Sequence, residues 1–153
     1  MPLTRRHLIL LGTAALAACA RRAPPPVTRA PMAPGATPEM MALVAKYADI
    51  HGIPESLLHR VIQRESSYNP GARNGQYYGL MQILPQTAKT MGYQGPPEGL
   101  LDAETNLMYA GKYLRGAWLV SDGSEDRAVM WYAKGYYYEA KRRGLLEETG
   151  LRT

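Results

Sequence analysis

The sequence predicts one all-α domain that begins near residue 37. Apolar side chains recur at three- and four-residue spacing in several segments, which is the pattern of an amphipathic helix. Proline, glycine and capping residues separate these segments, and no run of alternating polarity is long enough to predict a strand. About 110 residues carry this pattern, which is enough for one hydrophobic core.

The first predicted helix spans residues 38–51. Thr37 is a typical N-cap residue, and Pro38 suits the first helical turn. Glu39 places a negative charge at the positive end of the helix dipole. Gly52 is expected to end the helix, because glycine readily takes the left-handed conformation found there.

The second predicted helix follows Pro54 and carries an acidic residue on its apolar face. Its apolar positions recur at a spacing that Glu65 continues, and they are Leu57, Leu58, Val61 and Ile62. Burial would remove hydration from the Glu65 carboxylate and favour its protonated form, which a general acid requires. Alternatively, Glu65 ends the helix, points outward and pairs with Arg64 or Arg60.

The rest of the domain is also expected to be helical. Pro85 starts a short helix, residues 95–99 form a loop, and Asp102 caps a longer helix. A break at residues 121–124 precedes a last helical stretch up to Gly144. The buried face of the longer helix is predicted to consist of Leu107, Ala110, Leu114 and Trp118.

Residues 1–18 have the features of a signal peptide. Arg5 and Arg6 form a basic start, and residues 8–18 form an apolar run too short to cross ~30 Å of hydrocarbon. Residues 16–19 read Leu-Ala-Ala-Cys, which resembles the lipobox of bacterial lipoproteins and implies lipidation of Cys19. The alternative is an unmodified Cys19 in an ordinary signal peptide. The paired arginines are also similar to a twin-arginine export signal, although ordinary signal peptides contain such pairs too.

Residues 19–36 are expected to form an extended tether between the anchor and the domain. They are rich in proline, alanine and arginine, and they lack apolar periodicity. Such a segment cannot bury enough surface to offset its chain entropy, and in polyproline geometry it would reach ~50 Å. The folded domain is therefore expected at residues 37–153.

Three ordered motifs carry a family resemblance. Residues 65–66 are Glu-Ser, residues 69–72 are Asn-Pro-Gly-Ala, and residues 79–88 are Gly-Leu-Met-Gln-Ile-Leu-Pro-Gln-Thr-Ala. They resemble the lytic transglycosylases of the Slt type, members of the lysozyme-like superfamily that cleave bacterial peptidoglycan. The resemblance covers roughly residues 38–144, and it implies a single lysozyme-like helical domain with catalytic function.

Two later blocks match the family less closely. A block around Asn106-Leu107 and Tyr113-Leu114 resembles one built on Asn-Ile and Tyr-Leu, and its expected role is packing. Residues 131–135 read Trp-Tyr-Ala-Lys-Gly, where the family has Ala-Tyr-Asn-x-Gly. The resemblance implies that Tyr132 reaches the catalytic glutamate. Ala133 lacks the asparagine amide that lies near bound sugar in the family, which puts that subsite in doubt.

No second acid lies in the motif blocks, so one carboxyl has to serve as both acid and base. The resemblance implies that Glu65 protonates the glycosidic oxygen and then deprotonates the C6 hydroxyl of the sugar, which gives 1,6-anhydromuramic acid. A hydrolase of the same fold and a non-catalytic wall-binding lipoprotein remain alternatives. The other acids near these blocks are expected at helix starts or in loops, and they are Glu98, Asp102, Glu104, Glu125 and Asp126.

The resemblance also implies substrate-binding residues near Glu65, and these are Ser66, Gly79, Met81, Gln82 and Tyr132. Ser66 is expected to hydrogen-bond the carboxyl or the sugar, or else to be only a residue of the helix C-terminal turn. Gly79 would let the backbone approach the cleft, and Gln82 would offer an amide to a sugar. Met81 would form an apolar wall or belong to the core.

Composition limits the remaining possibilities. The net charge of +5 invites a nucleic-acid interpretation, but export favours a basic surface that faces the carboxylates of peptidoglycan stems or anionic lipid headgroups. The expected partners are therefore peptidoglycan glycan strands and a membrane reached through the lipid anchor, and no nucleic acid is expected. The histidines are too scattered to predict a metal site, and no cofactor is expected. The protein is therefore expected in the cell envelope, facing the periplasm. The dense tyrosines are expected to divide between sugar contacts and the core, and they are Tyr77, Tyr78, Tyr136, Tyr137 and Tyr138.

Overall fold

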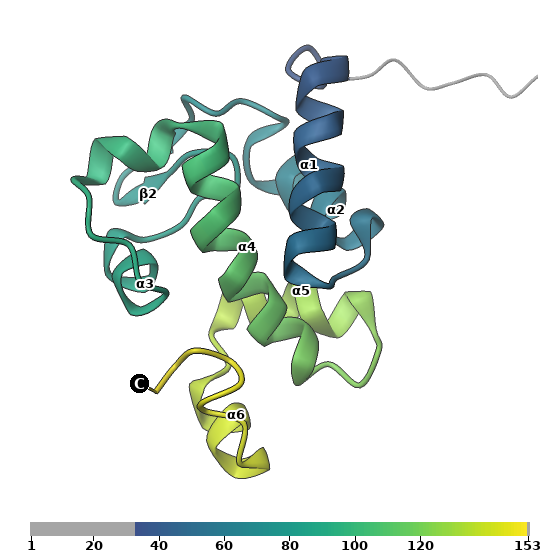
Figure 1. Ribbon diagram of the computed structural model, residues 1–153, viewed down its shortest axis with the longest axis vertical. Helices are drawn as coiled ribbons and strands as arrows, with labels where there is room; N and C mark the ends of the chain where they lie inside the picture. The colour runs from purple at the N-terminus through teal and green to yellow at the C-terminus, as the bar shows by residue number, and fades with distance from the viewer. Residues whose placement is uncertain (1–32, 153) are drawn as a thin grey trace, which may run out of the picture. The chain divides into compact units, whose positions relative to one another are not determined.

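The computed structural model describes residues 33–152, which belong to one compact unit. These residues form α-helices, one short 3-10 helix and a small β-hairpin (Figure 1). The predicted helical fold class is confirmed. The predicted signal peptide, Cys19 and most of the predicted tether lie outside the described residues.

The first two helices begin and end close to the predicted residues. Helix α1 spans Pro38–His51, and the Thr37 side chain accepts a hydrogen bond from the Met40 N–H at its start. Gly52 ends α1 in the left-handed conformation, with a φ of 60°. Helix α2 spans Glu55–Ser66 and buries the four predicted apolar residues.

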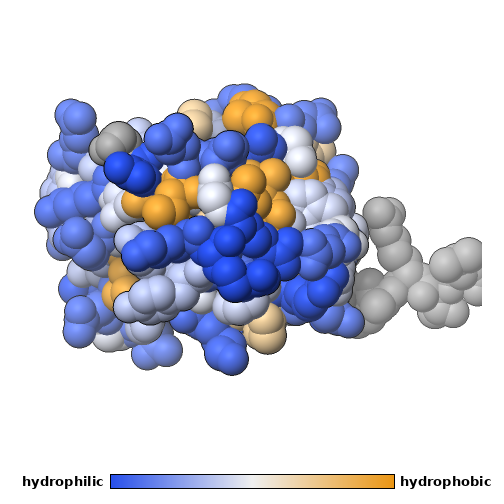
Figure 2. Space-filling model, turned by 90° about the horizontal axis from the view of Figure 1, so that it is seen from below, coloured by the Kyte–Doolittle hydropathy of each residue, from blue (hydrophilic) through white to orange (hydrophobic). Residues whose placement is uncertain are grey.

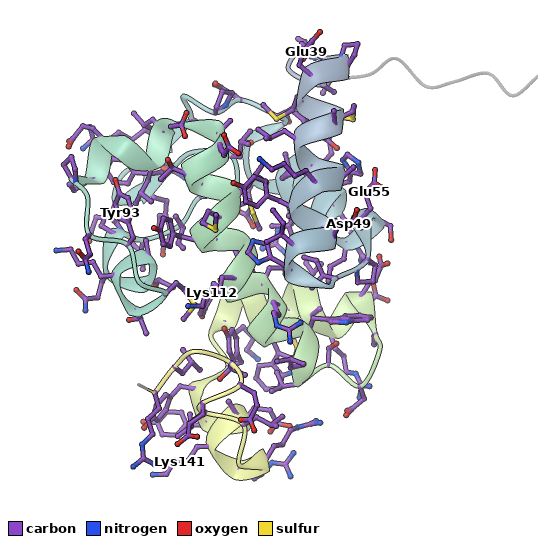
Figure 3. All side chains as sticks on the ribbon, viewed as in Figure 1. Glu39, Asp49, Glu55, Tyr93, Lys112 and Lys141 are labelled. Atoms are coloured by element: carbon purple, nitrogen blue, oxygen red, sulfur yellow. The ribbon has the colours of Figure 1, made fainter. Side chains whose placement is uncertain are left out.

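Helix α4 (Ala103–Leu119) crosses the domain between α1 and the smaller lobe that holds the hairpin and α3 (Pro85–Thr90), as Figure 1 shows. The Asp102 carboxylate accepts a hydrogen bond from the Thr105 N–H and caps the helix as predicted. Lys112 points from α4 toward the end of α3 (Figure 3), where its ammonium donates to the Met91 carbonyl. The core beside α4 includes Val44, Leu57, Leu58, Ile62, Leu107 and Leu114.

The hairpin is the first departure from the sequence prediction. Strands β1 (Arg73–Asn74) and β2 (Tyr77–Tyr78) pair antiparallel across a turn at Gly75 and Gln76. Each strand has only two residues, which is too short to show alternating polarity. The local signal was Gly75, because glycine readily takes the positive φ that the first central position of a two-residue hairpin turn requires.

Two further boundaries differ from the prediction. The predicted loop at residues 95–99 overlaps a 3-10 helix, η1 (Pro97–Leu101). The last helical stretch is divided into α5 (Glu125–Lys134) and α6 (Tyr137–Arg143), because Gly135 has a φ of 82° and a ψ of 145°. A backbone in that conformation cannot continue a helix.

The end of the predicted tether belongs to the folded domain. The Ala36 N–H donates to the Ala33 carbonyl, and Ala36 is buried in the core. A Cβ built on Gly35 would lie within 3 Å of the Tyr68 backbone, so this segment packs closely against the loop after α2. The tether prediction is therefore wrong for residues 33–36, because their small side chains fit against the domain.

The face shown in Figure 2 is mainly hydrophilic, and apolar side chains form a narrow band across its centre. Within residues 33–152, no helix combines the length and the apolar character needed to span a bilayer.

Candidate active site

An open cavity lies where the end of α2 meets the hairpin, the loop after it and α5. Its volume is about 380 Å³. Among residues 33–152, Glu65 is the only carboxylate that lines it, and the Glu65 side chain is 21% exposed. The other lining residues are Arg64, Asn74, Tyr77, Gln82, Tyr132 and Ala133.

Glu65 combines features of both arrangements that the sequence left open. It continues the buried stripe of α2 and lines the cavity, but its carboxylate also pairs with the Arg64 guanidinium at 3.0 Å. Arg60, the other candidate partner, pairs instead with Asp126 on α5. The Glu65 carboxylate is thus accessible from the cavity and held beside one cation.

Ser66 connects the end of α2 to the loop that follows the hairpin. Its hydroxyl donates a hydrogen bond to the Leu80 carbonyl, with 2.7 Å between the oxygens. It also lies 3.4 Å from the Ile62 carbonyl oxygen. In this structure the hydroxyl therefore fixes the loop rather than contacting the Glu65 carboxyl.

Gly79 allows a close backbone approach, but not toward the cavity. Its φ is +76°, and an added Cβ would lie within 3 Å of the Leu100 carbonyl oxygen and the Asn106 amide. Both the left-handed conformation and the missing side chain are therefore needed for the loop to pack against η1 and α4.

Gln82 lies at the edge of the cavity with an unusual backbone conformation, since its φ is +49°. Its amide nitrogen donates to the Gly79 carbonyl at 2.9 Å and to the Ala72 carbonyl at 3.1 Å. These bonds hold the loop against the segment before the hairpin. The amide NH₂ is occupied here, so the amide oxygen is the Gln82 group left to contact a ligand.

The Met81 side chain is fully buried, so it belongs to the core and does not form an apolar wall of the cavity. Both its backbone N–H and its backbone carbonyl form hydrogen bonds. The Met81 N–H donates to the Asn106 side-chain oxygen at 2.9 Å, and its carbonyl accepts from the Tyr132 hydroxyl at 2.8 Å. The loop is thereby tied to both α4 and α5.

Tyr132 is buried, and its hydroxyl donates to the Met81 carbonyl rather than to Glu65. Burial holds the pKa of the Tyr132 hydroxyl well above its usual value, and the negative charge of Glu65 raises it further. The hydroxyl therefore stays protonated and remains a donor at neutral pH. Tyr132 fixes the loop beside Glu65, and the direct contact implied by the family resemblance is replaced by this bond.

Asn106 supports the site through contacts that the sequence prediction missed, and Asn74, which lines the cavity, was not predicted either. Asn106 is fully buried, and besides its bond to Met81 its NH₂ donates to the Tyr78 carbonyl at 2.9 Å and to the Leu100 carbonyl at 2.8 Å. The expected role of the block that contains Asn106 was packing. The signal was the asparagine itself, because an amide on a buried helix face needs hydrogen-bond partners.

A second hollow of about 100 Å³ continues the cavity toward α3 and α4, where Thr87 and Tyr113 line it. It shares lining residues Tyr77, Gln82, Tyr132 and Ala133 with the first. Ala133 is exposed and borders both hollows, which together are here called the groove. The asparagine amide that the family has at this position would therefore lie in the wall of the groove, between the two hollows.

The tyrosines divide between core and surface. Tyr78 and Tyr136 are buried, whereas Tyr77, Tyr137 and Tyr138 are exposed. Only Tyr77 of the exposed three lines the groove.

The described histidines have structural partners. A ring nitrogen of His51 bonds the Leu107 carbonyl, and His59 lies between Tyr68 and Glu55. Within residues 33–152, no group of three His, Cys, Asp or Glu side chains could hold a metal ion.

Comparison with known proteins identifies the family. The family model described as "Transglycosylase SLT domain" matches residues 42–145. The chain belongs to this family. The prediction from the three motif blocks is thereby confirmed, and the match includes every residue of the groove described above.

Relatives of this SLT domain include proteins from a phage and from bacteria. The domain is 34% identical over 97 residues to the peptidoglycan transglycosylase gp16 of Escherichia phage T7, which covers 61% of this chain and 7% of the phage protein. It is 38% identical over 95 residues to the membrane-bound lytic murein transglycosylase F of Shewanella woodyi, covering 58% and 19% of the two chains. It is 38% identical over 82 residues to the membrane-bound lytic murein transglycosylase C of Yersinia pestis, covering 48% and 23%.

The aligned part is thus less than a quarter of the length of each of these relatives. No solved structure gives a significant match.

Proposed function

We propose that this SLT domain is a peptidoglycan lytic transglycosylase that uses Glu65 as its single acid and base. It cleaves the β-1,4 bond between N-acetylmuramic acid and N-acetylglucosamine and leaves a 1,6-anhydro sugar. Family membership and the names of the relatives support this activity. The observation that carries it is that Glu65 is the single carboxylate of the described residues in the cavity.

The presence of only one acid in the cavity determines the proposed route. Retaining and inverting glycosidases place two carboxyl groups on either side of the scissile bond. Here protonated Glu65 gives its proton to the glycosidic oxygen as the bond to the anomeric carbon breaks, and the substrate's acetamido group assists. Ionised Glu65 then takes the proton of the C6 hydroxyl, whose oxygen bonds to the anomeric carbon. Glu65 ends protonated, as it began, and no water is consumed.

The hydrogen bonds around Glu65 support the positioning that this route needs. An intramolecular nucleophile is effective only when the sugar is held in a reactive geometry. The loop at residues 79–84 borders the cavity, and it is tied to α2 by Ser66, to α4 by Asn106 and to α5 by Tyr132. The proposed role of these three residues is therefore to fix the groove wall beside the acid.

Two alternatives make different predictions. A hydrolase of the same fold would release a reducing sugar, and a wall-binding lipoprotein would release nothing. The departure at Ala133 motivates the second alternative, but it removes a sugar contact and leaves the carboxyl of Glu65 in the same cavity. The cavity with its carboxylate favours catalysis.

The acid is tested by Glu65→Gln, which keeps the shape of the side chain but cannot transfer a proton. Release of anhydro-muropeptides from purified sacculi should fall at least ~100-fold. Glu98→Gln is the matched control, because Glu98 is exposed on η1 and does not line the cavity. Near wild-type release by a folded Glu65→Gln protein would contradict the proposed mechanism.

We also propose that Cys19 carries a lipid that anchors the protein in the cell envelope, with the domain facing the periplasm. The lipobox-like residues 16–19 support this, and two relatives are named membrane-bound. In the expressing bacterium, the wild-type protein should fractionate with membranes, and Cys19→Ala should lose the N-terminal modification. An unmodified soluble pool for both proteins would contradict the anchor.

A further inference from the structure

The two faces of the hairpin line different cavities. Asn74 and Tyr77 pair across the strands, and both line the cavity that contains Glu65. Arg73 and Tyr78 form the neighbouring pair. Because successive side chains of a strand point to opposite faces, this second pair faces away from Glu65. It borders a separate cavity of about 400 Å³.

This second cavity, here called the Arg73–Lys89 cavity, carries positive charge without a matching acid. Its polar lining side chains are Arg73, Gln76, Tyr78, Gln86 and Lys89, and no carboxylate of the part of the chain that the structure describes lines it. The cavity therefore favours an anionic ligand.

The Arg73 guanidinium is positioned by an aromatic ring, and no acid of the described residues neutralises its charge. Its guanidinium lies over the Tyr78 ring, 4.6 Å from the ring centre. Within residues 33–152, neither Arg73 nor Lys89 forms an ion pair. The arginines that do pair with acids are Arg60, Arg64, Arg127, Arg142 and Arg143. Arg73 thus keeps its fork of N–H donors free for a carboxylate, the group that this fork fits best.

The Arg73–Lys89 cavity connects to the Glu65 cavity across the hairpin turn. A hollow over the turn is lined by Asn74 and Tyr77, which border the Glu65 cavity. It is also lined by Gly75, Gln76 and Leu84, which border the Arg73–Lys89 cavity. A side branch of a sugar bound at Glu65 could therefore cross the turn. An extended peptide of four residues reaches about 13 Å.

We propose that the Arg73–Lys89 cavity binds a carboxylate of the stem peptide that branches from a muramic acid bound in the groove. The cavity makes the domain prefer peptide-bearing glycan over peptide-free glycan. Arg73 and Lys89 bind the carboxylate, and the Gln76 and Gln86 amides can bond the peptide backbone. This inference rests on the proposed function and adds a specificity to the same groove.

The kinetic test is the double variant Arg73→Gln/Lys89→Gln. Its substrates are glycan strands with stem peptides and the same strands after an amidase has removed the peptides. Because both cations are exposed, we expect a loss on the order of fivefold in kcat/KM on peptide-bearing strands. On stripped strands kcat/KM should not change. The loss should shrink at high salt, which screens such contacts.

A matched control removes the same charge elsewhere. Lys141→Gln/Arg152→Gln neutralises two exposed cations at the C-terminal end, where Lys141 lies on α6 far from the hairpin (Figure 3). It should leave both substrates unaffected. An equal loss on both substrates with Arg73→Gln/Lys89→Gln, or no loss on peptide-bearing strands, would overturn the inference.

A binding measurement separates this inference from the proposed function. A stem tetrapeptide with free carboxylates should shift the amide resonances of Gly75, Gln76 and Lys89 in the wild-type protein, and a carboxyamidated peptide should not. If wild-type protein releases anhydro sugars from stripped strands but the peptide shifts none of these resonances, the inference alone fails. If it releases none from either peptide-bearing or stripped strands, the proposed function fails, and the inference falls with it.

Discussion

Replacement of Asn106 by aspartate should strongly destabilise the domain. Asn106 is fully buried and uses all of its side-chain groups, since its oxygen accepts from Met81 and its NH₂ donates to the Tyr78 and Leu100 carbonyls. Asn106→Asp keeps the size and the acceptor but replaces both donors with an oxygen. That oxygen would face two carbonyl oxygens.

The expected cost follows from these contacts. Each buried group left without a partner costs about 1–3 kcal/mol, and two carbonyls lose their donor. A buried charge adds to this, so the total should be at least ~3 kcal/mol. In a domain of this size, the melting temperature should fall by roughly 10 °C or more. The introduced carboxyl should have a raised pKa in the folded state, so the deficit should shrink as the pH falls and the carboxyl becomes a donor.

Thermal and urea unfolding followed by circular dichroism would measure this cost at pH 7 and pH 5. Gln94→Glu is the matched control, because it makes the same amide-to-carboxylate change at an exposed position. An Asn106→Asp protein within about 1 kcal/mol of wild type would refute the reasoning, since that is the size of one ordinary hydrogen bond.

Three further substitutions test the groove wall and the core. Tyr132→Phe removes the donor to the Met81 carbonyl, so the free energy of unfolding in urea should fall by about 1–3 kcal/mol and turnover should fall as well. Wild-type values for both would mean that this bond is unimportant. Gly79→Ala should destabilise by more than ~1 kcal/mol, because of its positive φ and the close neighbours, and a neutral effect would contradict the packing described. Burial lowers the pKa of His51, so the unfolded state binds more protons below about pH 6.5, and stability should fall as the pH drops through that range. His51→Gln should flatten this dependence in urea unfolding at pH 7.5 and 5.5, and an unchanged slope would assign it to other groups.

Local features of the fold were predictable because they depend on neighbouring residues. Thr37, Gly52 and Asp102 begin or end helices through contacts within a few residues, and the structure places all three as expected. The two-residue strands and the division at Gly135 were missed. Their cause is a single backbone conformation, which leaves little trace in a periodic pattern.

The sequence located the segments around the candidate site, but only Glu65, Gln82 and Tyr132 of the predicted site residues line the cavity. Glu65 was found from its place on an apolar stripe, and the motifs located the surrounding loop. The partners of Ser66 and Tyr132 depend on where the loop at residues 79–84 packs, which Asn106 determines from another helix. The Arg73–Lys89 cavity likewise joins a hairpin and a helix, so no local pattern in the sequence marks it.

The most direct test of the central claim is the chemistry of the product. Purified sacculi would be digested with the wild-type protein in heavy-oxygen water, and the released muropeptides analysed by mass spectrometry. Because Glu65 as single acid and base directs the sugar's own C6 hydroxyl to the anomeric carbon, the products should be anhydro sugars, lighter by one water and free of heavy oxygen. Reducing sugars that carry one heavy oxygen would show that water is the nucleophile and would contradict the account.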